Sequence, residues 1–410
     1  MAKRGNRFGQ GVNGKHILIG IVVLVLIGLI VWACVYDPAN LFGNLQTDGT
    51  GANAWMGEND WILQIKLGVG GENCKSADGV YSCRYLYASS TEPQLKLITK
   101  TTADQPVSTN PSYQFYQSAQ NHDFVSWNDQ GAAIGGDPHT CTGNTGAAHD
   151  KGSVVYDANG GVYLQSSNPQ WGFWNQGFLN SCDIDGGECL KHASTRDDPH
   201  RTSPIHPGLQ TNLAQHMLFV KIPSASDLAS MAELMSNANL CQIEGSLPGF
   251  TPCSGSCPKN RDYMQKDIGK VSIIAKPRGT ETTDVWAYLN QKECGSGGIH
   301  VMSFCIPPCP GDAPGVTDVH NARNSVSSIM NTDCGLPADA NDAKGNPLKI
   351  HSFKQNHSKI GVCDSPSSDT VIIGGNNHAP HSQGPRGGLF VVIKNNDLAN
   401  TFRCLFKDPS

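Results

Sequence analysis

The sequence lacks an excess of positive charge. Its 410 residues carry 30 Lys and Arg against 35 Asp and Glu, and four of the basic residues lie within the first 15 positions. Residues 37–410 therefore hold 26 basic and 35 acidic side chains, a net charge of −9, which is unusual for a protein that binds DNA at neutral pH, where a basic surface is the normal footprint. Thirteen of the 14 histidines lie in the same region, and their full protonation in an acidic compartment would bring its charge to +4. The balance is compatible with polyanion binding at low pH.

Charge is absent altogether from Ile17–Val35, a run of apolar residues long enough to cross a bilayer as a helix. Basic residues precede this run, so the positive-inside rule predicts a single-pass protein with a cytoplasmic tail at 1–16 and a stalk at 36–58. The remainder would lie in a lysosome-like compartment, at the cell surface or on a virion membrane. A cleaved signal peptide is the alternative, and Cys34 gives a weaker indication of a lipoprotein site.

Cysteine is not scarce: there are 15, and 14 remain when Cys34 is set aside. An even number on the non-cytoplasmic side favours up to seven disulfides. Zinc is the alternative, because the pairs Cys253/Cys257 and Cys305/Cys309 have spacings within the range seen in zinc sites. The spacing gives no disulfide connectivity.

Short apolar runs with strand character follow the stalk, and 225–237 has a helical composition. The strand candidates are 60–67, 81–89, 124–127, 217–222, 271–275, 299–304 and 389–393. Long stretches rich in Gly, Pro, Ser and Asp separate these runs, so we predict a mixed α/β (α+β) fold with many loops.

A two-part pattern recurs at half-length. The first copy is His149-Asp150-Lys151, then Asp157, then Asn168, and the second is His357-Ser358-Lys359, then Asp364, then Asn377. The copies are offset by 208 residues, close to half of the region after the stalk. This echo predicts two related halves, 59–215 and 216–405, each a β-sheet with flanking helices.

Each His-x-Lys leads into a strand-like run, and residues i and i+2 of a strand point to the same face. The ring and the ammonium of each copy can therefore converge on one phosphate. Two lysines would offset phosphate charge, one imidazole could attack phosphorus, and the other could protonate the leaving oxygen. The candidate catalytic residues are His149, Lys151, His357 and Lys359, supported by Asp157, Asn168, Asp364 and Asn377. The chemistry requires no metal and no cofactor.

Three further side chains are candidates for substrate contact. Trp171 and Trp174 follow the first motif and could stack on bases, although packing within the fold is the alternative reading. His378 follows Asn377 and could line the site, although a histidine in a Gly/Pro-rich loop is commonly only solvated.

These motifs resemble the phospholipase D superfamily, whose members place one H-x-K-x(4)-D…G-S-x-N set in each of two halves. His357, Lys359 and Asp364 match that spacing, whereas the first copy has one extra residue before Asp157, as is typical of the deoxyribonuclease II branch. Further stretches resembling this branch are 59–62, 85–87, 127–130, 157–164, 284–286 and 386–388. The resemblance spans about residues 59–405.

The resemblance implies a pseudo-dimeric phospholipase D-like fold that cleaves DNA internally without a divalent metal, best at acidic pH, leaving 3′-phosphate ends. By analogy His149 would be the nucleophile and His357 the general acid. Gln165 departs from the family pattern, which usually has histidine there, so a supporting group is expected to be lost. Two alternatives remain: a phospholipid phosphodiesterase held at a bilayer by its anchor, and a non-catalytic structural or receptor protein of a membrane such as a virion envelope.

Overall fold

The described helices and strands of this computed structural model all lie in the unit Gly51–Ser410. The structure describes residues 51–66, 85–98, 111–127, 148–167, 215–253, 261–279, 284–295, 297–303, 315–318, 328–330, 334–336, 349–351, 357–378 and 386–406. Over these ranges no helix combines the length and the apolar character needed to span a membrane. The predicted tail 1–16 and transmembrane segment 17–35 lie outside the described residues.

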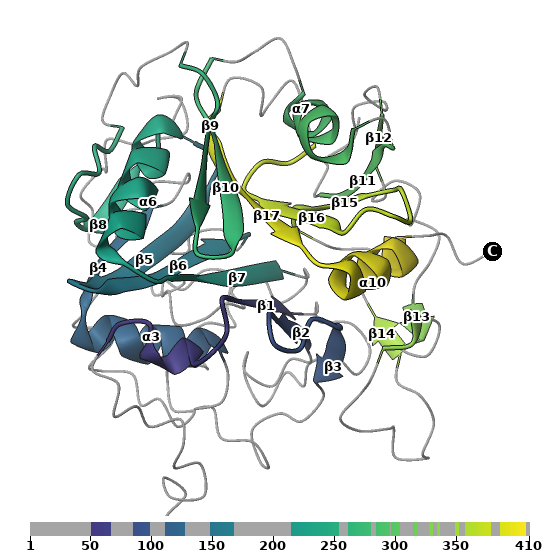
Figure 1. The fold of residues 1–410 in the computed structure, drawn as a ribbon, viewed down its shortest axis with the longest axis horizontal. Coiled ribbons are helices and arrows are strands. Elements are labelled where there is room, and N and C mark those ends of the chain that lie inside the picture. The colour runs from purple at the N-terminus through teal and green to yellow at the C-terminus, as the bar shows by residue number, and fades with distance from the viewer. Residues whose placement is uncertain are drawn as a thin grey trace, which may run out of the picture. The chain divides into compact units, whose positions relative to one another are not determined.

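The first sheet has eight strands in the spatial order β3-β2-β1-β7-β6-β5-β4-β8, all neighbours antiparallel (Figure 1). Their bounds are β1 Trp61–Lys66, β2 Tyr85–Ser89, β3 Lys96–Ile98, β4 Asp123–Trp127, β5 Lys151–Asp157, β6 Gly160–Ser166, β7 Gln215–Ile222 and β8 Gln242–Gly245. Side chains along β1 alternate between two apolar clusters, with Leu63 and Ile65 in one and Ile62 in the other. Both faces of the sheet are therefore buried, which is why β7 reads as a continuous apolar run.

The second sheet has seven strands in the order β12-β11-β15-β16-β17-β10-β9, antiparallel except for the pair β11 and β12. Their bounds are β9 Met264–Ile268, β10 Val271–Lys276, β11 Ile299–Met302, β12 Val316–Asp318, β15 Ile360–Cys363, β16 Thr370–Gly374 and β17 Gly388–Lys394. A separate ribbon pairs β13 Ser328–Met330 with β14 Lys349–His351. The helical elements are η1 Ala54–Met56, α3 Pro111–Asn121, α6 Ala225–Asn237, α7 Val285–Leu289, η4 Asn290–Cys294 and α10 Asn396–Phe406.

Five strands of each sheet repeat one arrangement. The order β1-β7-β6-β5-β4 in the first sheet matches β10-β17-β16-β15-β11 in the second, with every neighbour antiparallel in both. In each set the strand that comes last in the chain runs into a helix, β7 into α6 and β17 into α10. The first set, which comprises β1, β4, β5, β6, β7 and α6, spans 61–237. The second set, which comprises β10, β11, β15, β16, β17 and α10, spans 271–406. The first set therefore includes α6 and almost all of β7, which lie in the segment 216–405 that the sequence analysis assigned to the second half. The motif echo locates equivalent residues in the two halves, but it does not locate the boundary between them.

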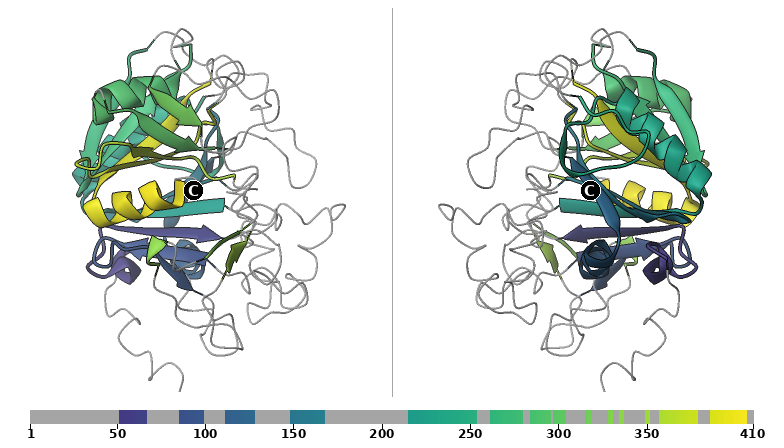
Figure 2. Two further views of the ribbon diagram at one scale, coloured as in Figure 1. Left: turned by 90° about the vertical axis from the view of Figure 1, so that its right-hand side faces the viewer. Right: turned by 90° about the vertical axis from the view of Figure 1, so that its left-hand side faces the viewer.

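The main apolar core lies between the two sheets. One cluster joins β7 residues such as Leu218 and Val220 to β17 residues such as Val391, and it includes the inner faces of α6 and α10. These two helices lie on opposite sides of this core (Figures 1 and 2). The outer face of the first sheet packs on α3 and η1, and that of the second sheet packs on α7. Both sheets are thereby fixed as rigid platforms for the residues at the ends of their strands.

Capping residues define where helices begin. Ser224 accepts a hydrogen bond from Asp227 N (3.1 Å) at the start of α6. Asp284 accepts from Trp286 N (2.7 Å) at the start of α7. Both are side chains that commonly satisfy the unpaired amides of a first helical turn.

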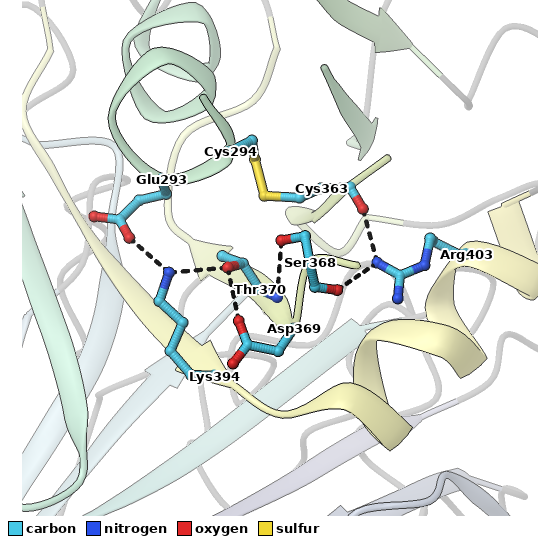
Figure 3. The surroundings of a disulfide bond; sticks show 8 residues. All are labelled: Glu293, Cys294, Cys363, Ser368, Asp369, Thr370, Lys394 and Arg403. Carbon is cyan, nitrogen blue, oxygen red and sulfur yellow. Dashed lines mark hydrogen bonds and ion pairs between the residues drawn. A yellow bond between two sulfur atoms is a disulfide. The ribbon is translucent and has the colours of Figure 1, made fainter. Parts of the chain in front are cut away.

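Disulfides form part of the second set. Cys294 pairs with Cys363, tying η4 to the end of β15, and Cys334 pairs with Cys404 of α10. Figure 3 shows the first of these beside Arg403, whose Nη1 donates to Cys363 O at 2.9 Å. Cys253 is also disulfide-bonded, which favours disulfides over zinc for that cysteine. The other three cysteines of the two candidate zinc pairs, Cys257, Cys305 and Cys309, lie outside the described residues.

The α+β class predicted from the sequence is confirmed, with two mostly antiparallel sheets and few helices. The helix predicted at 225–237 has those bounds, and each predicted strand overlaps an observed one. The predicted stalk 36–58 extends too far along the chain. Ala52 and Met56 are buried against α3 and the first sheet, because their apolar side chains complete the cluster on its outer face.

Candidate active site

The first motif lies where the two sheets meet. His149 precedes β5, and its backbone N–H donates to Gly387 O (2.9 Å) at the start of β17. Its ring Nδ1 donates to Gly375 O (2.8 Å), just after β16. The Lys151 ammonium lies 3.4 Å from the other ring nitrogen, Nε2, and both side chains are buried. A residue of the first set is therefore oriented by backbone of the second set.

The second motif is held in the reciprocal way. His357 Nδ1 lies 2.8 Å from Ser167 O, just after β6, and 3.0 Å from Lys359 Nζ. A carbonyl oxygen only accepts, so Nδ1 carries the ring proton and donates it to Ser167 O. The Lys359 ammonium also donates to His357 O. In both motifs the carbonyl bond fixes the tautomer and leaves Nε2 as the nitrogen available for chemistry.

Hairpin geometry explains why the His-x-Lys and Asn-bearing segments recur together. Lys151 pairs with Ser166 across the β5–β6 hairpin, and Lys359 O accepts from Gly374 N (3.0 Å) beside the β15–β16 hairpin. The start of one strand and the end of the next thus share an edge of the sheet. At each edge a carbonyl of the strand end, Ser167 O or Gly375 O, accepts from the histidine of the other set.

Electrostatics also couple the two motifs, whose rings are each held by a carbonyl of the other set. Burial, together with Lys359, Lys151 and, more weakly, His149, holds the pKa of His357 well below its usual range, and the bond to Ser167 only partly offsets this. Lys151 and His149 belong to the other set, and they can act on the His357 ring only at short range through a buried region. The arrangement is a buried cluster of imidazoles and ammonium groups, suited to an anion.

Asp150, the middle residue of the first motif, is fully buried, and its carboxylate accepts hydrogen bonds from residues outside the two His-x-Lys motifs. Its carboxylate accepts from Trp127 Nε1 (2.9 Å), Leu389 N (2.8 Å) and Gln165 Nε2 (3.4 Å). Burial raises the pKa of Asp150 to about 6, although these hydrogen bonds and Lys151 oppose the shift. Gln165, where the sequence predicted the loss of a supporting group, therefore supports the neighbour of His149.

The predicted supporting carboxylates lie elsewhere. Asp157 ends β5, about 20 Å from Lys151 at the rise of a strand, and accepts from Ala52 N (2.6 Å). Asp364 follows β15 and lies 3.5 Å from His300 Nδ1. Backbone carbonyls, and not these two carboxylates, hold the rings of His149 and His357.

Two of the remaining predicted residues, Asn377 and His378, lie in the part of the chain that the structure describes. Asn377 follows β16 beside Gly375, and its Oδ1 is buried with no hydrogen-bond partner among the described residues. The buried His378 ring lies 3.3 Å from Asp284 Oδ2 at the start of α7, so its described contact is a carboxylate, and its role as a substrate contact stays a prediction. Asn168, Trp171 and Trp174 lie outside the described residues.

A third imidazole lies in the cluster and belongs to no motif. His216, on β7, is fully buried, and its Nδ1 accepts a hydrogen bond from Lys359 N at 3.2 Å. Burial, then Lys359 and Lys151, hold its pKa well below its usual range. The only sequence signal was the polar pair Gln215-His216 directly before the apolar run 217–220 of the same strand.

Residues 58–239 match the deoxyribonuclease II family. This match, over somewhat less than half of the chain, supports its membership of the deoxyribonuclease II family. The matched segment runs from just before β1 to just after α6, so it contains the whole first set, including His149, Lys151 and His216. No curated protein matches the chain. In this deoxyribonuclease II-like chain, the described residues contain no group of three or more His, Cys, Asp or Glu side chains that could hold a metal ion.

Proposed function

We propose that this chain is a phosphodiesterase that cleaves DNA internally through a phosphohistidine, without a metal, best at acidic pH, and leaves 3′-phosphate ends. The observation that carries the proposal is the reciprocal anchoring of His149 and His357 around two buried lysines. Family membership supports the class of reaction, phosphodiester hydrolysis by a nuclease. The two-sheet arrangement is consistent with a phospholipase D-like pseudo-dimer.

The proposed reaction has two displacements at phosphorus. In the first, neutral Nε2 of His149 forms a bond to phosphorus while the bond to O5′ breaks, and Nε2–H of His357 gives its proton to O5′. In the second, water attacks phosphorus and returns a proton to His357 while the phosphorus–His149 bond breaks, which releases a 3′-phosphate. Lys151 and Lys359 stabilise the nonbridging oxygens in both steps.

Protonation of His357 is the demanding requirement, because burial and the lysines favour its neutral form. A bound phosphodiester adds a negative charge beside the ring and so raises its pKa. Acidic pH supplies the same proton from solution. Both effects place the expected optimum below neutrality, with a bell-shaped profile that reports the coupled pair.

The variants His149→Asn and His357→Asn test this proposal. Asparagine can keep a donor where Nδ1 stood but has no Nε2, so the carbonyl bonds to Gly375 and Ser167 can persist while the reactive nitrogen is lost. We expect plasmid cleavage in excess chelator to fall by at least about 10³-fold in each variant. His122→Asn is the matched control, since His122 lies on the segment after α3 and bonds to Ser118.

Trapping identifies the nucleophile. Quenching wild-type turnover in base and mapping the adduct by mass spectrometry should place phosphate on His149. Phosphate on His357 would reverse the two roles. Wild-type protein that cleaves no DNA between pH 4 and 7 would refute the proposal, and cleavage abolished by chelator would point to a metal nuclease.

We also propose that the catalytic unit lies on the non-cytoplasmic side of a membrane. The disulfides Cys294–Cys363 and Cys334–Cys404 support this placement, because such bonds persist mainly in oxidising compartments. Protection of the folded unit from protease in sealed vesicles, and its loss on lysis, is the expected result if residues 17–35 anchor the chain.

A further inference from the structure

His216 lies in the candidate active site without a role in the reaction proposed above. It is fully buried on β7, between β1 and β6, and its backbone N–H donates to Ser167 Oγ at 2.9 Å. Its backbone O accepts from Ser167 N at 3.1 Å. The backbone of this residue therefore positions the segment whose carbonyl anchors His357. These backbone bonds do not require an imidazole side chain.

The tautomer of the His216 ring follows from its one hydrogen bond. Nδ1 accepts from Lys359 N, and a ring nitrogen that accepts cannot carry a proton. Burial, Lys359 and Lys151 keep the ring neutral, so its single proton is on Nε2. Nε2–H is a buried donor with no partner among the described residues. Donors in this condition are rare in folded proteins and call for a ligand or a role.

The fold itself does not demand histidine at this position. In the first sheet, Lys151 pairs with Ser166, and Met217 pairs with Ser166 on the other side, which places His216 one residue earlier on β7. In the second sheet the same count from Lys359 leads through Gly374 and Phe390 to Leu389. Leucine fills the matching position, so a polar ring there is a property of this site and not of the strand arrangement.

We infer that His216 Nε2–H donates a hydrogen bond to a nonbridging oxygen of the bound phosphate, as a third, uncharged member of the clamp formed with Lys151 and Lys359. The inference rests on the proposed phosphodiesterase function. The His216 ring accepts a hydrogen bond from Lys359 N, and both lysines lower its pKa. An anion that contacts the two ammonium groups would therefore lie close to this ring. A neutral donor adds no further positive charge to an already cationic site, and it keeps its proton across the working pH range.

Two substitutions separate the structural from the binding role of this ring. His216→Asn keeps an acceptor near the position of Nδ1, so the bond from Lys359 N can persist, but it has no donor at the position of Nε2. His216→Gln places an amide N–H near the position of Nε2. His122→Asn serves again as the matched control, and unfolding midpoints confirm that each variant is folded.

We expect His216→Asn to bind inorganic phosphate about 10-fold more weakly by titration calorimetry and to lose about 10²-fold in kcat on a DNA duplex. His216→Gln should recover part of both losses. The ratio of wild-type to His216→Asn activity should stay constant from pH 5 to 7, because the donor does not titrate. A ratio that changes with pH would overturn the inference in favour of a proton-transfer role.

The outcomes distinguish this inference from the proposed function. If wild-type protein cleaves DNA and His216→Asn binds phosphate and cleaves as well as wild type, the inference is wrong and the function stands. If wild-type protein neither cleaves DNA nor binds phosphate, both are wrong. If Gln is as impaired as Asn while both variants remain folded, the loss does not come from the Nε2 donor, and the inference is again wrong.

Discussion

Acidification from pH 7 to pH 5 should destabilise the ligand-free protein through two residues of the site. His216 and His357 are buried, and burial and the lysines hold the pKa of each well below the ordinary value of 6.5. Below pH 6.5 the unfolded chain binds a proton at each ring that the folded chain does not bind. Stability contributed by the neutral rings is therefore present above pH 6.5 and is lost as pH falls toward the folded-state pKa.

The magnitude has an upper limit set by the unfolded chain. For a ring that stays neutral in the fold and titrates at 6.5 when unfolded, the free energy of unfolding falls by about 2 kcal/mol between pH 7 and pH 5. Asp150 acts in the opposite direction. Its pKa of about 6 in the fold, against an ordinary value of 3.8, makes the folded state gain roughly 1 kcal/mol over the same interval.

The assay compares pH dependence rather than absolute stability. Urea unfolding with the disulfides intact, in phosphate-free buffers of constant ionic strength, gives the free energy of unfolding at pH 5, 6 and 7. We expect His216→Asn and His357→Asn each to reduce the loss on acidification by up to about 2 kcal/mol. The contribution of Asp150 is common to the wild type and both variants, so it cancels in the comparison. An unchanged pH dependence in both variants would refute the conclusion that the two rings are neutral and buried.

Two further predictions concern packing and covalent structure. Gly375→Ala should destabilise the fold by about 1–3 kcal/mol and abolish cleavage, because a Cβ at this position would clash with Asp150 Oδ2. Thermal unfolding and plasmid cleavage measure the two effects. Gly51→Ala is the control, because its Cβ would meet nothing closer than 3.5 Å. Replacing Cys294 and Cys363 together by Ser opens a loop of 69 residues. Urea unfolding should show a free energy of unfolding lower by about 2–4 kcal/mol. Retention of full stability would show that the bridge does not constrain the chain.

The sequence predicted that each His-x-Lys leads into a strand, and in the structure Lys151 opens β5 and Lys359 directly precedes β15. The catalytic role of the four motif residues stays a prediction. A His-x-Lys at the start of a strand positions both side chains on one face whatever the rest of the sheet does. The offset of 208 residues then identifies the partner motif. Strands such as β7 and β17 were predictable for a related reason, since burial on both faces requires continuous apolar runs.

Other parts of the site depend on tertiary contacts that local patterns do not encode. His216 is 67 residues from His149 in the chain and meets Lys359 only because β7 enters the first sheet beside β6. The carbonyls of Ser167 and Gly375, which replace the predicted carboxylates behind the rings, are backbone atoms that leave no mark in the sequence. The sequence shows Asp150 as the middle residue of the first motif, but it does not show that its carboxylate accepts a hydrogen bond from Leu389 N in the other sheet.

The reciprocal bonds between the sets make the site inseparable from the pairing of the sheets. The family match covers only 58–239, which supplies His149, Lys151 and His216, while His357 and Lys359 come from the second set. Without the second set, the His149 ring would lose the carbonyl of Gly375, and Asp150 would lose the amide of Leu389. A buried carboxylate deprived of its donors is costly, so the first set should not retain a working half-site alone. The proposed catalysis would therefore require both sets, and the 208-residue echo is consistent with that requirement.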